Sequence, residues 1–360
     1  MKLTTKIAAA AAALLLVAGP ALAQKTMRLA HLNPDSPFDS HSGAMAAVFK
    51  NLVETGTNGS VKVQIFANGQ LGKDNEVIQQ VRDGIVESTI SSAGGVAQHY
   101  KLVGVFDLPF AFPNIATVDR VMTLDSAFGK KMAADIEAKT GLKTLGLLDS
   151  GGYFVISNSK RPIKTVEDMA GLRIRTMTLP THETIIKSLG GQPTPLPWAE
   201  VYTALQTGVA DGQMNPIPII AFAKFDEVQK YLTVTNHVIT PYFWFVNKKF
   251  YDGLTPAEKL VVDNAAEVAT AAGRGISRII EASTEKGLPK LGKKMSINAL
   301  PPAELKKFAA ASQPAVRKLI EDNLGAEGKD MLAKSGLAIT SAENLADAAA
   351  KVVAAAGGAN

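Results

Sequence analysis

Three side chains at the ends of predicted strands and helices have the chemistry to bind a small anion. Arg175 lies near the carboxyl end of a strand predicted over residues 172–177, where open α/β sheets place ligand groups. Its planar guanidinium suits a carboxylate, and the alternative is a solvent-facing side chain. Trp198 opens a helix and serves either as core packing or as a flat wall over a ligand. The amide of Asn215, before Pro216, either binds a ligand oxygen or closes an Asx-turn.

The sequence contains no motif of a metal site or a catalytic site. Its histidines never stand at the short spacings that favour chelation; they are His31, His41, His99, His182 and His237. Cysteine is absent, which excludes thiolate catalysis, iron–sulfur clusters and cysteine-ligated zinc. No phosphate loop or nucleophile elbow occurs either. We therefore predict no catalytic residue, no metal and no cofactor.

Strands and helices alternate in the first part of the chain. Apolar patterns predict strands over residues 27–31, 61–66, 88–91 and 142–148, and helices over 38–54, 75–81 and 115–139. This βαβ order is typical of an α/β sheet with largely parallel strands.

The second part of the chain repeats this alternation. The patterns predict strands over residues 155–156, 172–175, 209–213 and 231–236, helices over 182–189 and 197–205, and a stiff proline-rich loop over 193–197. A chain of 360 residues fits about two domains. Two α/β units of similar size predict a two-lobed protein with a crevice between the lobes.

A long helix follows these two units. Residues 255–258 (TPAE) form a capping box, and a helical apolar spacing continues without proline to about Glu285. Such a helix is ~45 Å long, which exceeds the width of one lobe. It either packs along one domain, with a kink at Gly273 or Gly275, or crosses both lobes and joins them.

Residues 1–23 have the pattern of a secretory signal peptide. Lys2 and Lys6 precede a short apolar run, and residues 21–23 (ALA) form the cleavage site. We expect an exported protein, cleaved after Ala23. Removal of two lysines and no acid lowers the formal charge from +5 to +3. Because no basic stripe is interleaved with aromatic residues, nucleic-acid binding is not expected.

Several motifs occur together in a fixed order along the mature chain. They are residues 66–74 (FANGQLGKD), 107–110 (DLPF), 171–175 (GLRIR), 193–195 (PTP), 200–208 (EVYTALQTG) and 211–216 (DGQMNP). The ordered set closely resembles the DctP-type solute-binding proteins of tripartite ATP-independent periplasmic (TRAP) transporters. The resemblance extends over nearly the whole mature chain.

The resemblance implies a fold class and partners. The fold is α/β with two lobes, each a mixed, mostly parallel sheet flanked by helices, with a long helix bridging both. The implied divisions are a signal peptide (1–23), mainly lobe 1 (24–149), mainly lobe 2 (150–240), a return segment through the interlobe region (241–254), the bridging helix (255–286) and C-terminal helices packing back on the lobes (287–360). A monomer in the periplasm would bind a small organic-acid or zwitterionic solute and pass it to TRAP permease subunits, driven by an ion gradient.

The resemblance also implies roles for site residues. The arginine of the family's G-L-x-I-R motif, here Arg175, holds the solute carboxylate. The asparagine of D-G-Q-x-N-P, here Asn215, contacts the same end of the ligand. The aromatic residue before E-V-Y, here Trp198, lines the pocket.

The chain departs from the family pattern at a second arginine that many members carry. Residues 151–155 (GGYFV) contain none, so a C4-dicarboxylate is less expected. Residues 175–178 and 193–198 resemble ectoine-binding members, but Leu32 and Asn33 stand where those members have glutamates. A strongly cationic ligand end therefore lacks its counter-charge, unless Asp35 supplies it. We expect a monocarboxylate with a hydroxyl-bearing, aromatic or weakly polar body. The candidates to contact that body are Ser92, Tyr153, Asn33, and Phe243 or Trp244.

Two other functions remain open at this point. The chain could feed a sensor kinase instead of a permease, which neighbouring genes would reveal. It could also be a secreted enzyme on the same scaffold, which would need an acid–base or nucleophile pair that the sequence does not show.

Overall fold

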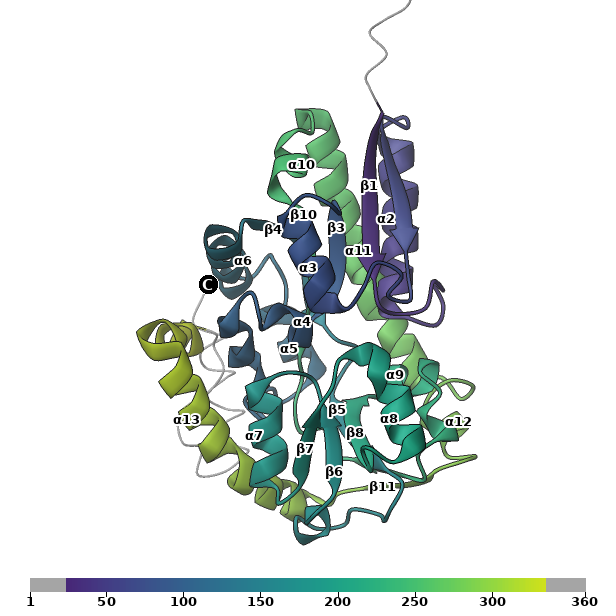
Figure 1. Ribbon diagram of the computed structural model, residues 1–360, viewed down its shortest axis with the longest axis vertical. Helices are drawn as coiled ribbons and strands as arrows, with labels where there is room; N and C mark the ends of the chain where they lie inside the picture. Colours follow the sequence, from purple (N-terminus) through teal and green to yellow (C-terminus); the bar gives the residue numbers. More distant parts are fainter. Residues whose placement is uncertain (1–23, 335–360) are drawn as a thin grey trace, which may run out of the picture.

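The computed structural model describes residues 24–334, which form two lobes stacked along the long axis of the molecule (Figure 1). The predicted signal peptide and the last part of the predicted C-terminal helical region, residues 335–360, lie outside this part of the chain. Within residues 24–334, no helix is long and apolar enough to cross a membrane.

The first lobe is built on a sheet with the strand order β2-β1-β3-β10-β4. Strands β1 to β4 are mutually parallel, and β10 runs antiparallel between β3 and β4. The strands are β1 Lys25–His31, β2 Val61–Phe66, β3 Ser88–Ser92, β4 Leu142–Asp149 and β10 Pro241–Asn247. The helices of this region are α2 His41–Gly56, α3 Asp74–Arg82, α4 Ala93–Val96, α5 Ile115–Val121, α6 Ala127–Thr140 and α10 Lys248–Asp252.

The second lobe is built on a sheet with the order β11-β9-β5-β8-β6-β7, in which only β5 runs against the other described strands. The strands are β5 Phe154–Asn158, β6 Arg173–Thr176, β7 Gln192–Pro195, β8 Gly212–Pro216, β9 Tyr231–Val234 and β11 Ser296–Ala299. The helices are α7 Pro180–Ser188, α8 Val201–Thr207, α9 Ile217–Phe222 and α12 Leu288–Leu291. The predicted fold of two mixed, mostly parallel sheets flanked by helices is confirmed.

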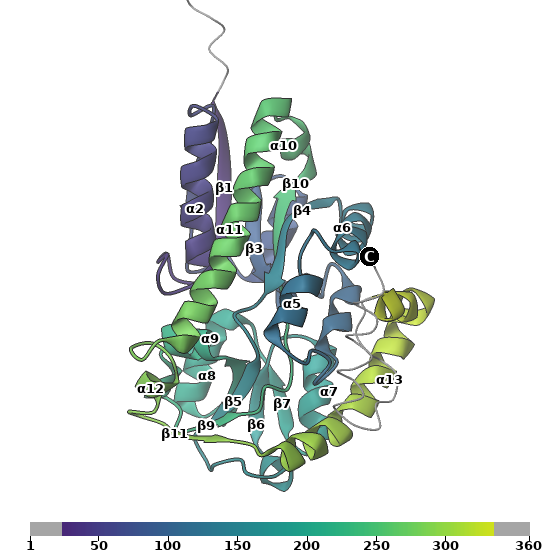
Figure 2. The ribbon, with the colours of Figure 1, turned by 180° about the vertical axis from the view of Figure 1, so that it is seen from behind.

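The long helix α11, Pro256–Ala282, bridges the lobes. It packs along α2 and β4 of the first lobe and reaches α9 of the second, as Figure 2 shows from behind. The predicted capping box is present, because Thr255 Oγ1 accepts from Glu258 N at 3.2 Å and Glu258 Oε2 accepts from Thr255 N at 2.8 Å. At Gly273 a Cβ atom would lie 2.7 Å from Cγ of Met45, so glycine permits the close approach of α11 and α2.

The start of α11 gives a prediction on acid stability. Burial raises the pKa of Glu258, but hydrogen bonds from Lys25, Thr255 and Ser60 outweigh it and hold the pKa at about 2, below the ordinary 4.5. The stabilisation is therefore complete above the ordinary pKa and is lost as pH falls toward 2. We expect Glu258→Gln to lower the free energy of unfolding at neutral pH by about 2 kcal/mol and to flatten its acid dependence, measured by urea denaturation. Exposed Glu267→Gln on the same helix is the control, and an unaltered acid profile in Glu258→Gln would contradict the assignment.

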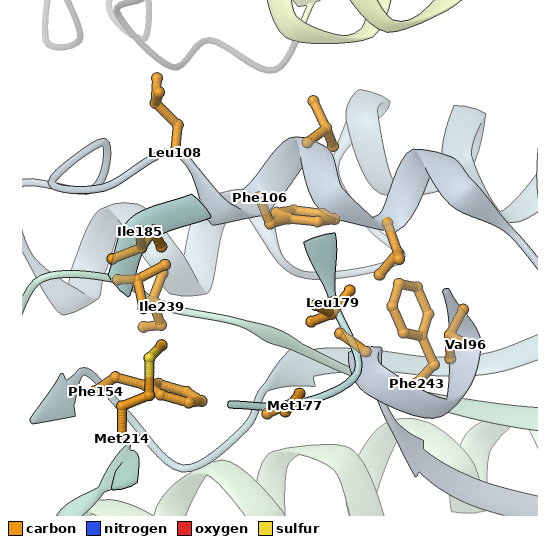
Figure 3. Close-up of a cluster of buried hydrophobic side chains, with 14 of the residues drawn as sticks. Val96, Phe106, Leu108, Phe154, Met177, Leu179, Ile185, Met214, Ile239 and Phe243 are labelled. Carbon is orange, nitrogen blue, oxygen red and sulfur yellow. The ribbon is translucent and has the colours of Figure 1, made fainter. Parts of the chain in front are cut away.

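One hydrophobic cluster joins the two lobes (Figure 3). Phe106, from the segment before the D-L-P-F motif, belongs to the same buried cluster as Phe154 and Ile185 of the second lobe. Helix α13, Pro302–Lys334, packs over this segment and α7. Residues 101–112, which precede α5, therefore help to hold the lobes together.

The secondary structure differs from the sequence prediction in two places, and in both the reason lies in the segment itself or its immediate neighbour. The single helix expected over residues 115–139 is α5 followed by α6, because Ser126 Oγ accepts from Gly129 N at 2.8 Å and caps a new helix. The proline-rich stretch expected as a loop includes β7. This strand lies at the edge of the sheet and pairs only with β6, so its prolines remove no inner ladder bond.

Two further differences concern pairings distant in sequence. The segment 241–254, expected as a return through the interlobe region, is the inner strand β10 followed by α10. The segment after α11, expected as C-terminal helices that pack back on the lobes, also contributes edge strand β11, which pairs with β9. Neither pairing has a local signal in the sequence, because the partner strands lie far away along the chain.

Candidate functional site

A cavity lies between the lobes, where strands of both sheets end. Its polar lining comes from both sides of the cleft: Asn33, Asp74, Ser92, Ser150, Arg175, Thr178, Asn215 and Tyr242. Trp198, Met177 and Pro197 supply apolar walls. The predicted candidates Arg175, Asn215, Trp198, Ser92 and Asn33 thus come together at one cavity.

Arg175 is the cation of the cavity. It lies in β6 between β7 and β8 and is 2% exposed. Its Nε and Nη2 donate to the carbonyl of Leu196 at 3.0 and 2.6 Å, which holds the guanidinium plane against the cavity wall. Burial lowers its pKa to about 10, partly offset by the charge of Asp74, so the side chain stays protonated at neutral pH. Within residues 24–334 no carboxylate forms an ion pair with it.

Arg173, two residues earlier on β6, has a different environment. Its Nη2 and Nε donate to the Asp211 carboxylate at 2.7 and 3.1 Å, and its side chain is 42% exposed. The solvent-facing alternative therefore describes Arg173, and the buried Arg175 keeps its charge for a partner in the cavity.

Asn215 and Trp198 extend the second-lobe wall. Asn215 lies within β8 opposite Val155, so it does not close the Asx-turn that its sequence position left open. Its Nδ2 donates to Gln213 Oε1 at 2.6 Å, which fixes the amide at the cavity. The Trp198 ring packs against Phe222 and Phe225, with centroids 6.0 and 5.8 Å away.

The first-lobe wall of the cavity is also polar, and its charged residue is an acid, opposite in sign to Arg175. Asp74, the first residue of α3, is 7% exposed and accepts a hydrogen bond from Ser92 Oγ at 2.7 Å. Asn33 Nδ2 donates to Ser42 Oγ at 2.9 Å and to the Tyr242 hydroxyl at 3.4 Å. Burial raises the pKa of Tyr242, so its hydroxyl remains a neutral donor and acceptor.

Three candidates from the sequence lie away from the cavity. Phe243 points to the opposite face of β10 from Tyr242 and stacks on Phe245 with centroids 5.6 Å apart. Trp244 shares the face of Tyr242 but lies two residues further into the sheet, where its Nε1 donates to Ser88 Oγ at 2.8 Å. Both side chains are fully buried in cores.

The third of these candidates, Tyr153, lies in the crossing from β4 to β5. Its hydroxyl donates to the carbonyl of Phe112 at 2.8 Å. It therefore ties the crossing to the segment around the D-L-P-F motif and does not line the cavity. The side chain that β10 presents to the cavity is Tyr242.

Sequence reasoning missed Asp74, Ser150 and Tyr242 as lining residues. Asp74 ends the motif F-A-N-G-Q-L-G-K-D, and its place at a helix start after glycines was the available signal. Ser150 and Tyr242 stand at the two chain crossings, where no local pattern marks them.

The described histidines are buried or engaged in the protein, and they form no metal site. Burial lowers the pKa of His31 and His41 to about 4 and that of His237 to about 3, so these rings are neutral. Within residues 24–334, no group of three or more His, Asp or Glu side chains is placed to hold a metal ion.

The family match and the similar proteins all point to bacterial solute-binding proteins. Residues 33–323 match the family described as bacterial extracellular solute-binding protein, family 7 (DctP). The chain is 32% identical to the 2,3-diketo-L-gulonate-binding periplasmic protein of Escherichia coli, over 80% of this chain and 85% of that one. It is 35% identical to the C4-dicarboxylate-binding periplasmic protein of Rhodobacter capsulatus, over 72% and 76%.

The fold comparison agrees. The sugar acid binding protein DctPAm of Advenella mimigardefordensis, solved with galactonate, superimposes with a TM-score of 0.79 at 34% identity. The match covers 87% of this chain and 98% of that one.

Proposed function

Since the chain belongs to family 7 of the bacterial extracellular solute-binding proteins, we propose that its interlobe cavity binds a hydroxylated monocarboxylate. As a TRAP solute-binding protein, it delivers its solute to a membrane permease. The observation that carries the ligand proposal is the buried charge of Arg175, which has no acidic partner among residues 24–334. A buried cation is stabilised strongly by a bound carboxylate, because burial removes the water that would otherwise solvate it.

The first-lobe wall supports a single carboxylate on the ligand. Asp74 would repel a second carboxylate that approached it, and it would accept hydrogen bonds from hydroxyl groups. Two other arginines of the interlobe region are already engaged. Arg278 pairs with Asp149 at 2.6 Å, and Arg274 donates to the carbonyl of Leu147 at 2.8 Å. These contacts favour sugar acids and related hydroxy acids over C4-dicarboxylates.

The remaining parts of the proposal concern location and chemistry. The relatives are periplasmic binding proteins, and the N-terminal pattern supports export with cleavage after Ala23. We propose that the protein acts as a monomer, that it binds its solute without turnover, and that Arg175, Asn215, Trp198, Ser92 and Asn33 contact the solute together with Asp74 and Tyr242.

A thermal-shift screen tests this proposal. The panel pairs acids with matched compounds: galactonate with galactitol, erythronate with erythritol, and succinate as the dicarboxylate. We expect hydroxylated monocarboxylates to raise the unfolding midpoint, because a ligand that binds only the folded state stabilises it, by about 3 kcal/mol at 100 times its dissociation constant. Neutral polyols lack the carboxylate and should give no shift. A larger shift with succinate than with any hydroxy acid would contradict the role given to Asp74.

A further inference from the structure

Two exposed ion pairs connect the lobes, one of them beside the cavity. Lys73, next to Asp74 in the first lobe, places Nζ 2.9 Å from Oε1 of Glu200, which follows Trp198 in the second lobe. Lys73 has no other ion-pair partner within residues 24–334. The negative charge of Glu76 also attracts its ammonium group.

The second pair lies at another contact between the lobes. Lys286, in the connection from α11 to α12, places Nζ 2.6 Å from Oδ1 of Asp39 and donates to the carbonyl of Phe38 at 2.8 Å. Asp39 belongs to the first lobe, just before α2, whereas α12 packs into the second-lobe core through Leu291.

We propose that the pairs Lys73–Glu200 and Asp39–Lys286 form an interlobe latch that stabilises the closed arrangement of the lobes and weakens as salt rises. Each pair has one partner on each lobe, so a motion that moves the lobes apart at these two contacts separates the charges. A neutral contact also lies near the cavity, the donation from Thr178 Oγ1 to the carbonyl of Gly94 at 3.2 Å. The latch concerns the closure of the lobes and does not depend on which solute the cavity binds.

The exposure of these side chains sets the size of the effect. The side chains of Lys73 and Glu200 are 45% and 46% exposed, and those of Lys286 and Asp39 are 39% and 50% exposed. Exposed ion pairs are weak, so each pair should change the ratio of closed to open molecules by about two- to fivefold. At such exposure, salt screens the attraction strongly. A latch of this strength favours closure and still permits release.

The chain contains no cysteine, so spin labels can be placed at two chosen sites without removing native thiols. The labels go on Asn51→Cys in α2 and Gln206→Cys in α8, both exposed and on different lobes. Double electron–electron resonance then measures the fractions of short and long interlobe distances in ligand-free protein at about 20 and 500 mM salt. The variants are Lys73→Glu, Glu200→Lys and the double reversal.

We expect each single reversal to reduce the short-distance fraction at low salt and the double reversal to restore it. High salt should reduce that fraction in the unsubstituted protein. Lys248→Glu is the matched control, because Lys248 pairs with Asp252 at 2.8 Å within the first lobe at similar exposure, and its distances should not change. Single reversals without effect, a double reversal that opens the protein further, or an unsubstituted protein that is fully open at low salt would each overturn the latch. These readouts need no solute, so they fail or succeed independently of the proposed ligand.

Discussion

Replacing Arg175 by methionine is expected to weaken binding of the acid that gives the largest thermal shift by at least ~100-fold, which corresponds to about 3 kcal/mol. Arg175 is 2% exposed, and the Leu196 carbonyl already orients its guanidinium, so the carboxylate loses a desolvated, charge-assisted contact that water cannot replace. Isothermal titration calorimetry at neutral pH measures the loss.

The same substitution should not destabilise the ligand-free protein. The lowered pKa of Arg175 shows that burial disfavours its charged form, and methionine fills similar space without that penalty. Urea denaturation without ligand should therefore give an unchanged or higher free energy of unfolding. Arg173→Met on the same strand is the control, with near-normal affinity expected. An affinity loss below fivefold in Arg175→Met would remove Arg175 from the site.

Replacing Trp244 by alanine is expected to lower the free energy of unfolding by about 3–5 kcal/mol, because it leaves a cavity in a packed core. The indole packs edge-on against Phe49 with centroids 4.6 Å apart, and it loses the hydrogen bond to Ser88 as well. Urea denaturation measures the loss of stability.

The affinity of folded Trp244→Ala for its best acid should stay within about threefold of the original, because the side chain lies outside the cavity. Tyr242→Phe, two residues away on β10, is the opposite case. It should change stability little and reduce affinity, since it removes the hydroxyl that Asn33 holds at the cavity. A strong affinity loss in Trp244→Ala without a loss of stability would reverse this assignment.

The parts of the fold that could be predicted are those marked by a pattern of neighbouring residues in the sequence. Thr255 and Glu258 predict the start of α11, and the alternation of buried Val61 and Val63 with outward Lys62 and Gln64 predicts β2. The strand-end position makes Arg175 a candidate ligand residue, and the resemblance of G-L-R-I-R to the family motif favours that role over a solvent-facing side chain.

The parts that could not be predicted depend on contacts distant in sequence. In β10 the residues Phe243, Trp244 and Phe245 are all fully buried, so no polar alternation shows which face meets the cavity. Asp74 lines the same cavity as Arg175 because the lobes meet there, and Tyr242 does so because β10 returns to the first lobe. No short stretch of the sequence shows that residues so far apart along the chain line one cavity.

The most direct test of the central claim is a crystal structure of the protein with the hydroxy acid that raises the unfolding midpoint most. We expect closed lobes, with a carboxylate oxygen within about 3 Å of the Arg175 guanidinium and a ligand hydroxyl beside Asp74. A carboxylate bound away from Arg175, or an acid bound outside the interlobe cavity, would contradict it.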